Sequence, residues 1–106
     1  MTRNAKTKFN KLMRLYEKRY KLFLKYEPIE TKLGRVDVNS KEHEDLIDKI
    51  VPIEGMMQEI TQEIQDICDD LITWQYSLTF EGIVCRLYHH KTKEHYYATV
   101  QSHDRL

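Results

Sequence analysis

The sequence lacks the residue patterns that build metal centres and disulfide frameworks. Its two cysteines, Cys68 and Cys85, lie seventeen positions apart and show neither the CxxC nor the Cys/His spacing of a zinc site. The neighbouring histidines His89, His90 and His95 have no pair of acids or thiols at fixed spacing beside them. We therefore expect two reduced thiols, no metal and no cofactor.

Long apolar runs and catalytic motifs are also missing. No apolar stretch approaches the roughly 20 residues of a membrane span, and the basic N-terminal segment is not followed by the apolar block of a signal peptide, so the cytoplasm is the expected location. GxSxG, HExxH and glycine-rich phosphate loops do not occur. Cys85 and His89 would lie about 13 Å apart along a strand, too far for a nucleophile and its base. A non-enzymatic protein is the prediction.

Glycine and proline are scarce, with three and two residues, so no stretch has the composition of a linker. Hydrophobic residues make up 41% of the 106 positions, which is typical of a folded chain with a modest core. The length leaves no room for a second domain, and residues 1–106 are expected to form one.

Charge is present but sorted along the chain. Residues 1–36 carry eleven Lys/Arg against three Asp/Glu, whereas residues 37–75 carry two against eleven. The remaining residues are close to neutral, with four against three, so the net charge of zero hides two opposite poles. Sorting of this kind indicates a binding surface without naming its partner.

Apolar side chains recurring at steps of three and four residues predict a basic helix over residues 4–26. Pro28 disfavours helical geometry at the residue before it, so we expect residues 28–40 to form a connector. Asn39 or Ser40 is positioned to cap the next helix. The predicted apolar stripe consists of Phe9, Leu12, Met13, Tyr16, Tyr20, Phe23 and Tyr26.

Residues 41–75 carry the most regular pattern, an apolar seam at alternating steps of four and three residues, as in a coiled coil. Pro52 and Gly55 lie inside this seam. We expect an acidic helix that is broken or kinked near Pro52, and favour a short helix over 41–50 followed by a main helix. The seam residues are Leu46, Ile50, Ile53, Met57, Ile60, Ile64, Ile67, Leu71 and Trp74.

Alternating β-forming residues predict a β-hairpin over residues 77–101, with a polar tip between His89 and Glu94. Gly82 lies where the alternation skips one position, which predicts a bulge. The fold class is therefore α+β, mainly α: an antiparallel helical hairpin with a coiled-coil-like seam, followed by a C-terminal β-hairpin that covers it. The side chains expected on the covering face include Leu78, Phe80, Ile83 and Cys85.

Five basic side chains repeat at steps of three and four residues along helix 4–26, roughly 140–200° away from Phe9, Tyr16 and Phe23. The row is about 21 Å long and suits a nucleic-acid backbone or an acidic partner; the alternative is a solvated helix face. The predicted hairpin tip adds Arg86, Lys91 and Lys93 among aromatic residues, which nucleic-acid-binding hairpins and ordinary cross-strand pairs both use. The row consists of Lys11, Arg14, Lys18, Lys21 and Lys25.

Acidic side chains repeat on the second helix, also away from its apolar seam. Their spacing of about 5–6 Å along the axis approximates that of backbone phosphates, so this face could occupy a protein groove that normally holds nucleic acid. The alternative is that it meets the basic helix of this fold or of a neighbouring copy. The residues are Glu59, Glu63, Asp66, Asp69 and Asp70.

Arg19 falls in the apolar seam of the first helix, where a guanidinium needs a partner. The favoured interpretation pairs it with Glu63 or Asp70. The functional alternative is an anchor for a carboxylate or phosphate of a ligand or partner, to which arginine offers a bidentate fork.

These observations favour a small interaction protein that acts as a stoichiometric regulator or inhibitor of a protein or nucleoprotein. In general character, without a shared motif, it resembles the small inhibitors that phages and mobile elements use against host or defence machinery. Direct nucleic-acid binding through the basic row is the alternative. A membrane surface is least favoured, because the apolar stripe is needed inside the fold. The isoleucine-rich seam is also compatible with a homodimer.

Overall fold

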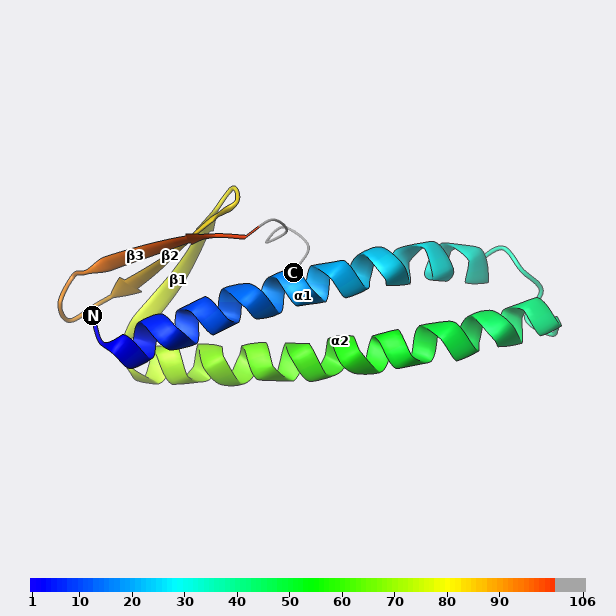
Figure 1. Cartoon of the computed structure of the whole chain (residues 1–106), viewed down its shortest axis with the longest axis horizontal. Coiled ribbons are helices and arrows are strands. Elements are labelled where there is room, and N and C mark those ends of the chain that lie inside the picture. Colours follow the sequence, from blue (N-terminus) through cyan, green and yellow to red (C-terminus); the bar gives the residue numbers. More distant parts are fainter. Residues whose placement is uncertain (101–106) are drawn as a thin grey trace.

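A computed structural model describes residues 1–100 of the chain. Two long antiparallel helices are followed by a three-stranded antiparallel sheet, in the order β1-β2-β3, that lies against one end of the helical pair (Figure 1). The fold is α+β and mainly α, with a helical hairpin followed by hairpin-connected strands, as the sequence predicts. The elements are α1 (Arg3–Leu33), α2 (Lys41–Thr73), β1 (Tyr76–Glu81), β2 (Val84–His89) and β3 (His95–Thr99).

Helix α1 is longer than its sequence predicts. It begins at Thr2, whose hydroxyl accepts a hydrogen bond from the Ala5 N–H at 3.2 Å, and it continues through Pro28 to Leu33. The predicted end at residue 26 is therefore wrong. Pro28 is exposed, while Ile29 and Leu33 beyond it are still half-buried. Packing of these side chains along α2 outweighs the one hydrogen bond that a proline nitrogen cannot donate.

The connector is correspondingly shorter than the predicted 28–40, because only residues 34–40 lie between the helices. Ser40 caps α2, as one of the two predicted candidates: its hydroxyl accepts from the His43 N–H at 3.2 Å. Asn39 instead donates its own N–H to the Asp37 side chain. A tight connector of this kind brings the two helices together as antiparallel neighbours.

Helix α2 runs without a break through Pro52 and Gly55, so the favoured break near Pro52 is wrong. The apolar seam keeps its phase across the proline, and an unbroken helix buries Ile50 on one side of it and Ile60 on the other. Pro52 itself is exposed. At the far end Trp74 follows the last helical residue and is 39% exposed, so it is outside the helix and the core.

Gly82 makes a turn, and the predicted bulge is wrong. It has φ +60° and opens the two-residue loop between Glu81 and Val84, a conformation that suits glycine at the first position of a type II′ hairpin turn. Ile83 is the other loop residue and is 57% exposed, so it does not share the covering face. The predicted hairpin is thus a three-stranded meander, and Gln101, its predicted last residue, lies outside the described residues.

The sheet covers the helical pair with its inner face, as predicted. Phe9 of α1 meets Tyr96 of β3, and Tyr16 meets Phe80 of β1, in both cases edge-on with ring centroids 5.6 Å apart. The main buried cluster comprises Ala5, Phe9, Leu12, Met13, Leu15, Tyr16, Ile60, Ile67, Leu71, Tyr76, Cys85, Leu87 and Val100.

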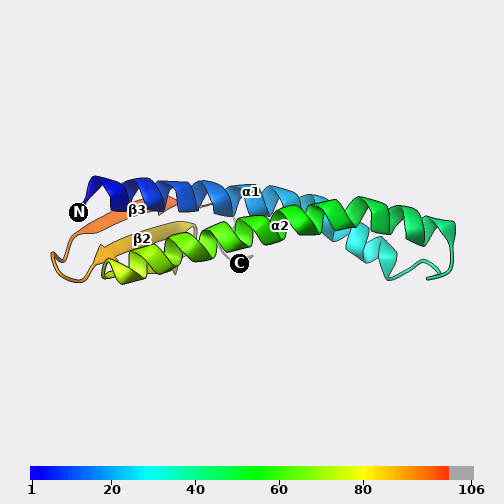
Figure 2. The same ribbon diagram turned by 90° about the horizontal axis from the view of Figure 1, so that it is seen from below.

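This core occupies one end of an elongated molecule that measures 59 × 23 × 15 Å along its principal axes. Figure 2 shows both helices running on past the sheet, where they pack only on each other. The part of the helical hairpin beyond the sheet, called the arm below, comprises the C-terminal part of α1, the connector and the N-terminal part of α2.

Candidate functional site

The predicted basic row lies on the solvent side of α1. All five residues are exposed, and they face away from Phe9, which points into the sheet. Lys11 lies 3.9 Å from the Glu63 carboxylate across the helical pair. The other four make no ion pair with any residue in 1–100, and they are Arg14, Lys18, Lys21 and Lys25.

Four of the five predicted acidic residues fall into two groups, and the fifth, Glu59, is exposed and makes no ion pair within residues 1–100. Asp70 accepts a hydrogen bond from Lys8 Nζ at 3.0 Å, and together with Glu63 it faces α1. Asp66 and Asp69 accept instead from glutamine side chains one turn earlier on their own helix, at 3.0 and 2.9 Å. The alternative in which the acidic face meets the basic helix of the same fold therefore holds for two of the five carboxylates.

The two charged rows run side by side on the flank of the helical hairpin that the sheet leaves open, joined by the pairs Lys8–Asp70 and Lys11–Glu63. Lys8 is not among the predicted site residues, although its place three residues before Lys11 is a usable signal. Lys8 and Asp70 are 40% and 47% exposed, so their pair is screened by water and binds the helices weakly. Most of the charge on this flank stays available to a partner.

Arg19 does not pair with Glu63 or Asp70, and that favoured interpretation is wrong. Both carboxylates face the open flank, where Glu63 pairs with Lys11 and Asp70 pairs with Lys8. Arg19 points to the other flank, which carries the sheet. Its Nε is buried and has no hydrogen-bond partner among the described residues. It lines a groove of about 370 Å³ together with Tyr20, Phe23, Tyr26, Glu54, Met57, Gln58 and Thr61.

Tyr26 and Glu54 face each other across this groove. Partial burial, the charges of Glu30 and Glu54, and a hydrogen bond to Glu54 raise the pKa of the Tyr26 hydroxyl. Tyr26 is therefore a neutral donor to the Glu54 carboxylate. Arg19, on the same groove, gains no partner from this arrangement.

The predicted hairpin-tip residues lie on the sheet and on the loop after β2. Arg86 is on the outer face, with its guanidinium 5.6 Å from the centroid of the Tyr88 ring, and Tyr97 beside it is 58% exposed. Lys91 and Lys93 are exposed in the loop. The outer face points away from the helices, so the structure does not bring these cations together with the basic row.

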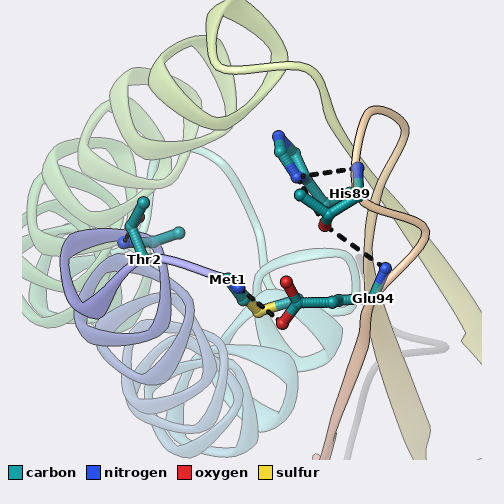
Figure 3. A network of polar contacts seen from close by, with 6 residues as sticks. Met1, Thr2, His89 and Glu94 are labelled. Atoms are coloured by element: carbon teal, nitrogen blue, oxygen red, sulfur yellow. Dashed lines mark hydrogen bonds and ion pairs between the residues drawn. The ribbon is translucent and has the colours of Figure 1, made fainter.

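The β2–β3 loop is held against the start of the chain (Figure 3). The amino group of Met1 forms an ion pair with Glu94, and His89 Nδ1 lies 2.8 Å from the Thr92 hydroxyl. The hydrogen bond and charge of the Met1 amino group lower the pKa of Glu94. These contacts hold the loop against the first residues of the chain.

The cysteines are protected thiols. Burial raises the pKa of Cys85 to about 12 and also raises that of Cys68, which is hydrogen-bonded to Tyr16. Burial therefore disfavours the thiolate, which is the reactive form, at both positions. Within residues 1–100, no group of three or more His, Cys, Asp or Glu side chains is arranged to hold a metal ion.

Comparisons with protein-family models, with curated proteins and with solved structures give no match. Neither described helix has a segment apolar enough to cross a membrane.

Proposed function

We propose that this chain is a small non-enzymatic binding protein that docks on a nucleoprotein through the open flank of its helical hairpin and acts there as a stoichiometric regulator or inhibitor. The observation that carries the proposal is the pair of parallel charged rows, most of whose members are exposed and outside ion pairs within residues 1–100. A nucleoprotein offers the complementary surface, with phosphates for the basic row and basic side chains for the acidic one.

The exposed state of these charges supports a docking role. Exposed charged side chains keep their hydration in the unbound protein. Separate rows of opposite sign fix the orientation of a complex and also affect its rate of formation. On the acidic side, Glu59, Asp66 and Asp69 remain free of cations in the described part of the chain. The acidic row therefore retains the carboxylates that a phosphate mimic needs.

Direct binding of nucleic acid is the second candidate, favoured by the four cations of the basic row that form no ion pair within residues 1–100. Contact with four phosphates predicts a log–log salt slope of about −3.6 on duplex DNA, at 0.9 per phosphate. This candidate makes the acidic row a source of repulsion, whereas the nucleoprotein proposal makes it part of the interface.

The two candidates are distinguished by whether removing the acidic-row charges weakens or strengthens binding. Fluorescence anisotropy compares the binding of wild type with that of an acidic-row variant, Glu59→Gln/Asp66→Asn/Asp69→Asn. The probes are bare duplex DNA, single-stranded DNA and RNA, and duplex DNA coated with a basic histone-like protein. The nucleoprotein proposal expects binding to coated DNA that this variant weakens. Tighter binding of the variant to bare nucleic acid supports the second candidate instead.

A matched basic-row variant, Arg14→Gln/Lys18→Gln/Lys21→Gln/Lys25→Gln, completes the comparison. Both candidates require it to weaken binding. Wild-type affinity in both variants, on every probe, overturns both proposals.

A further inference from the structure

Beyond the edge of the sheet, the flank that carries it continues along the arm, and no element within residues 1–100 covers it there. On α1, Tyr16 packs under Phe80 of the sheet, and Tyr20, one turn further along, lines the open groove. On α2, Cys68 packs against the core, and Thr61, two turns earlier, lines the same groove. The groove is thus the uncovered extension of a surface that is covered at the other end of the molecule.

The groove is built like part of a core. Phe23, Tyr26 and Met57 line it, and Leu24 and Val51 are exposed on the same arm to 52% and 54%. A helical layer with one apolar flank is stable when a further layer covers that flank, as the sheet does at the other end. Within residues 1–100 the arm consists of its two helices, and no further layer lies over the groove.

The groove also contains an unpaired polar atom, because Arg19 Nε has no hydrogen-bond acceptor within residues 1–100. A buried guanidinium nitrogen without an acceptor is costly, and arginine is suited to a carboxylate. Glu54 on the opposite wall already accepts from Tyr26. A carboxylate on a covering surface is the complementary group for this arginine.

The chain itself offers that carboxylate at a matching distance. Glu27 is exposed, makes no ion pair among the described residues, and lies four residues after Phe23 on α1, just as Arg19 lies four residues before it. Four helical residues span about 6 Å. If two copies of α1 cross antiparallel at Phe23, each Arg19 faces the other copy's Glu27.

We propose that a second copy of this chain covers the groove, with a two-fold axis near Phe23 and two reciprocal Arg19–Glu27 pairs between the copies. The contact is isologous, because the same patch serves on both subunits. Two arms then form a four-helix layer, and the two sheets lie at its opposite ends. The charged rows of the open flank take no part, so this inference is independent of the function proposed above.

Sedimentation velocity from micromolar to submillimolar concentrations tests the proposal. Wild type is expected to dimerise, and both Arg19→Glu and Glu27→Arg are expected to weaken the dimer at least about tenfold, since each places like charges together. The double variant Arg19→Glu/Glu27→Arg restores the pairs with their signs exchanged and recovers dimerisation. Lys18→Glu, on the solvent side of α1, is the matched charge reversal and leaves the dimer intact.

A cross-link checks the axis without changing any charge. Phe23→Cys places a thiol at the axis itself, and oxidised glutathione is expected to join two copies through it, while Val38→Cys in the connector stays unlinked. A monomer at every concentration overturns the proposal. So does a dimer that Arg19→Glu leaves unchanged, and so does a heterologous protein that binds the arm of a strictly monomeric chain.

Discussion

The ring of Phe9 meets the ring of Tyr96 edge-on, with centroids 5.6 Å apart, and this contact joins the first helix to the last strand. The Tyr96 hydroxyl adds a 3.4 Å hydrogen bond to the side chain of Asn10, the next residue on the helix. The two ends of the described chain are therefore held together in the core. Folding of the sheet end requires the chain to be nearly complete.

Replacing Phe9 with alanine is expected to destabilise the protein by about 3–5 kcal/mol, because the ring is fully buried and its loss leaves a cavity. Urea unfolding followed by circular dichroism measures the change. Tyr97→Ala is the matched control: it removes a ring from the exposed outer face of β3, the strand whose Tyr96 contacts Phe9, and is expected to cost under about 1 kcal/mol. Equal losses from the two variants would contradict the assignment of Phe9 to the core.

Two glycines are expected to respond to alanine in opposite directions. Gly82 has φ +60° and open space around it, so Gly82→Ala costs about 1 kcal/mol through backbone strain alone. Gly55 is exposed inside α2 and a methyl group there meets nothing within 4 Å, so Gly55→Ala stabilises by about 0.5–1 kcal/mol. Thermal unfolding of both variants reports the signs. A stabilising Gly82→Ala would rule out the turn described for β1 and β2.

Alkaline pH is expected to lower the free energy of unfolding. The pKa of Cys85 is about 12 in the folded protein, against about 8.5 for a free thiol, so the native state keeps a proton that the unfolded state has lost. Stability is therefore complete below about pH 8.5 and declines toward pH 12. Urea midpoints between pH 7 and 10.5 measure the decline, and Cys85→Ala is expected to flatten it. An unchanged slope in that variant would assign the effect to other groups.

The carboxyl of Glu94 is expected to titrate below the ordinary glutamate range. Its ion pair with the Met1 amino group favours the charged form, so the folded-state pKa is lowered. The pair stabilises the fold above the unfolded pKa of glutamate and is lost as the pH falls through the folded one. Carbon-detected NMR titration measures the value. Acetylation of the Met1 amino group should return it to the ordinary range, whereas no change would exclude the pair in solution.

The sequence predicts the elements well where one period dominates. The 4-3 spacing from Leu46 to Leu71 is sufficient to place α2, and the alternation around Cys85 places the inner face of the sheet. The predicted helix end before Pro28 and the predicted break near Pro52 are wrong for one reason: the apolar contacts of a longer helix outweigh the local backbone preference of proline. At Gly82 a turn and a bulge leave the same one-residue skip in the alternation, so pattern alone could not separate them.

The sequence predicts the candidate surfaces less completely than it predicts the helices and strands. Helical spacing places Lys11 and Glu63 on the solvent side of their own helices, but which lysine meets which carboxylate depends on the stagger between α1 and α2, and periodicity does not contain that stagger. For the same reason, helical spacing alone predicts the wrong carboxylates for Arg19. That its Nε has no hydrogen-bond partner within residues 1–100 is visible only in three dimensions.

The arm also sets how firmly different parts of the chain are held. In the arm the two helices pack only on each other within the described residues, so its backbone amides can exchange when the helices fray from the connector inward. Strand β2 is hydrogen-bonded to a strand on each side, so its amides exchange only when the whole fold opens. Hydrogen exchange should therefore be graded along the 59 Å axis. A partner or second copy that grips the arm would slow exchange there and leave the sheet end as it is.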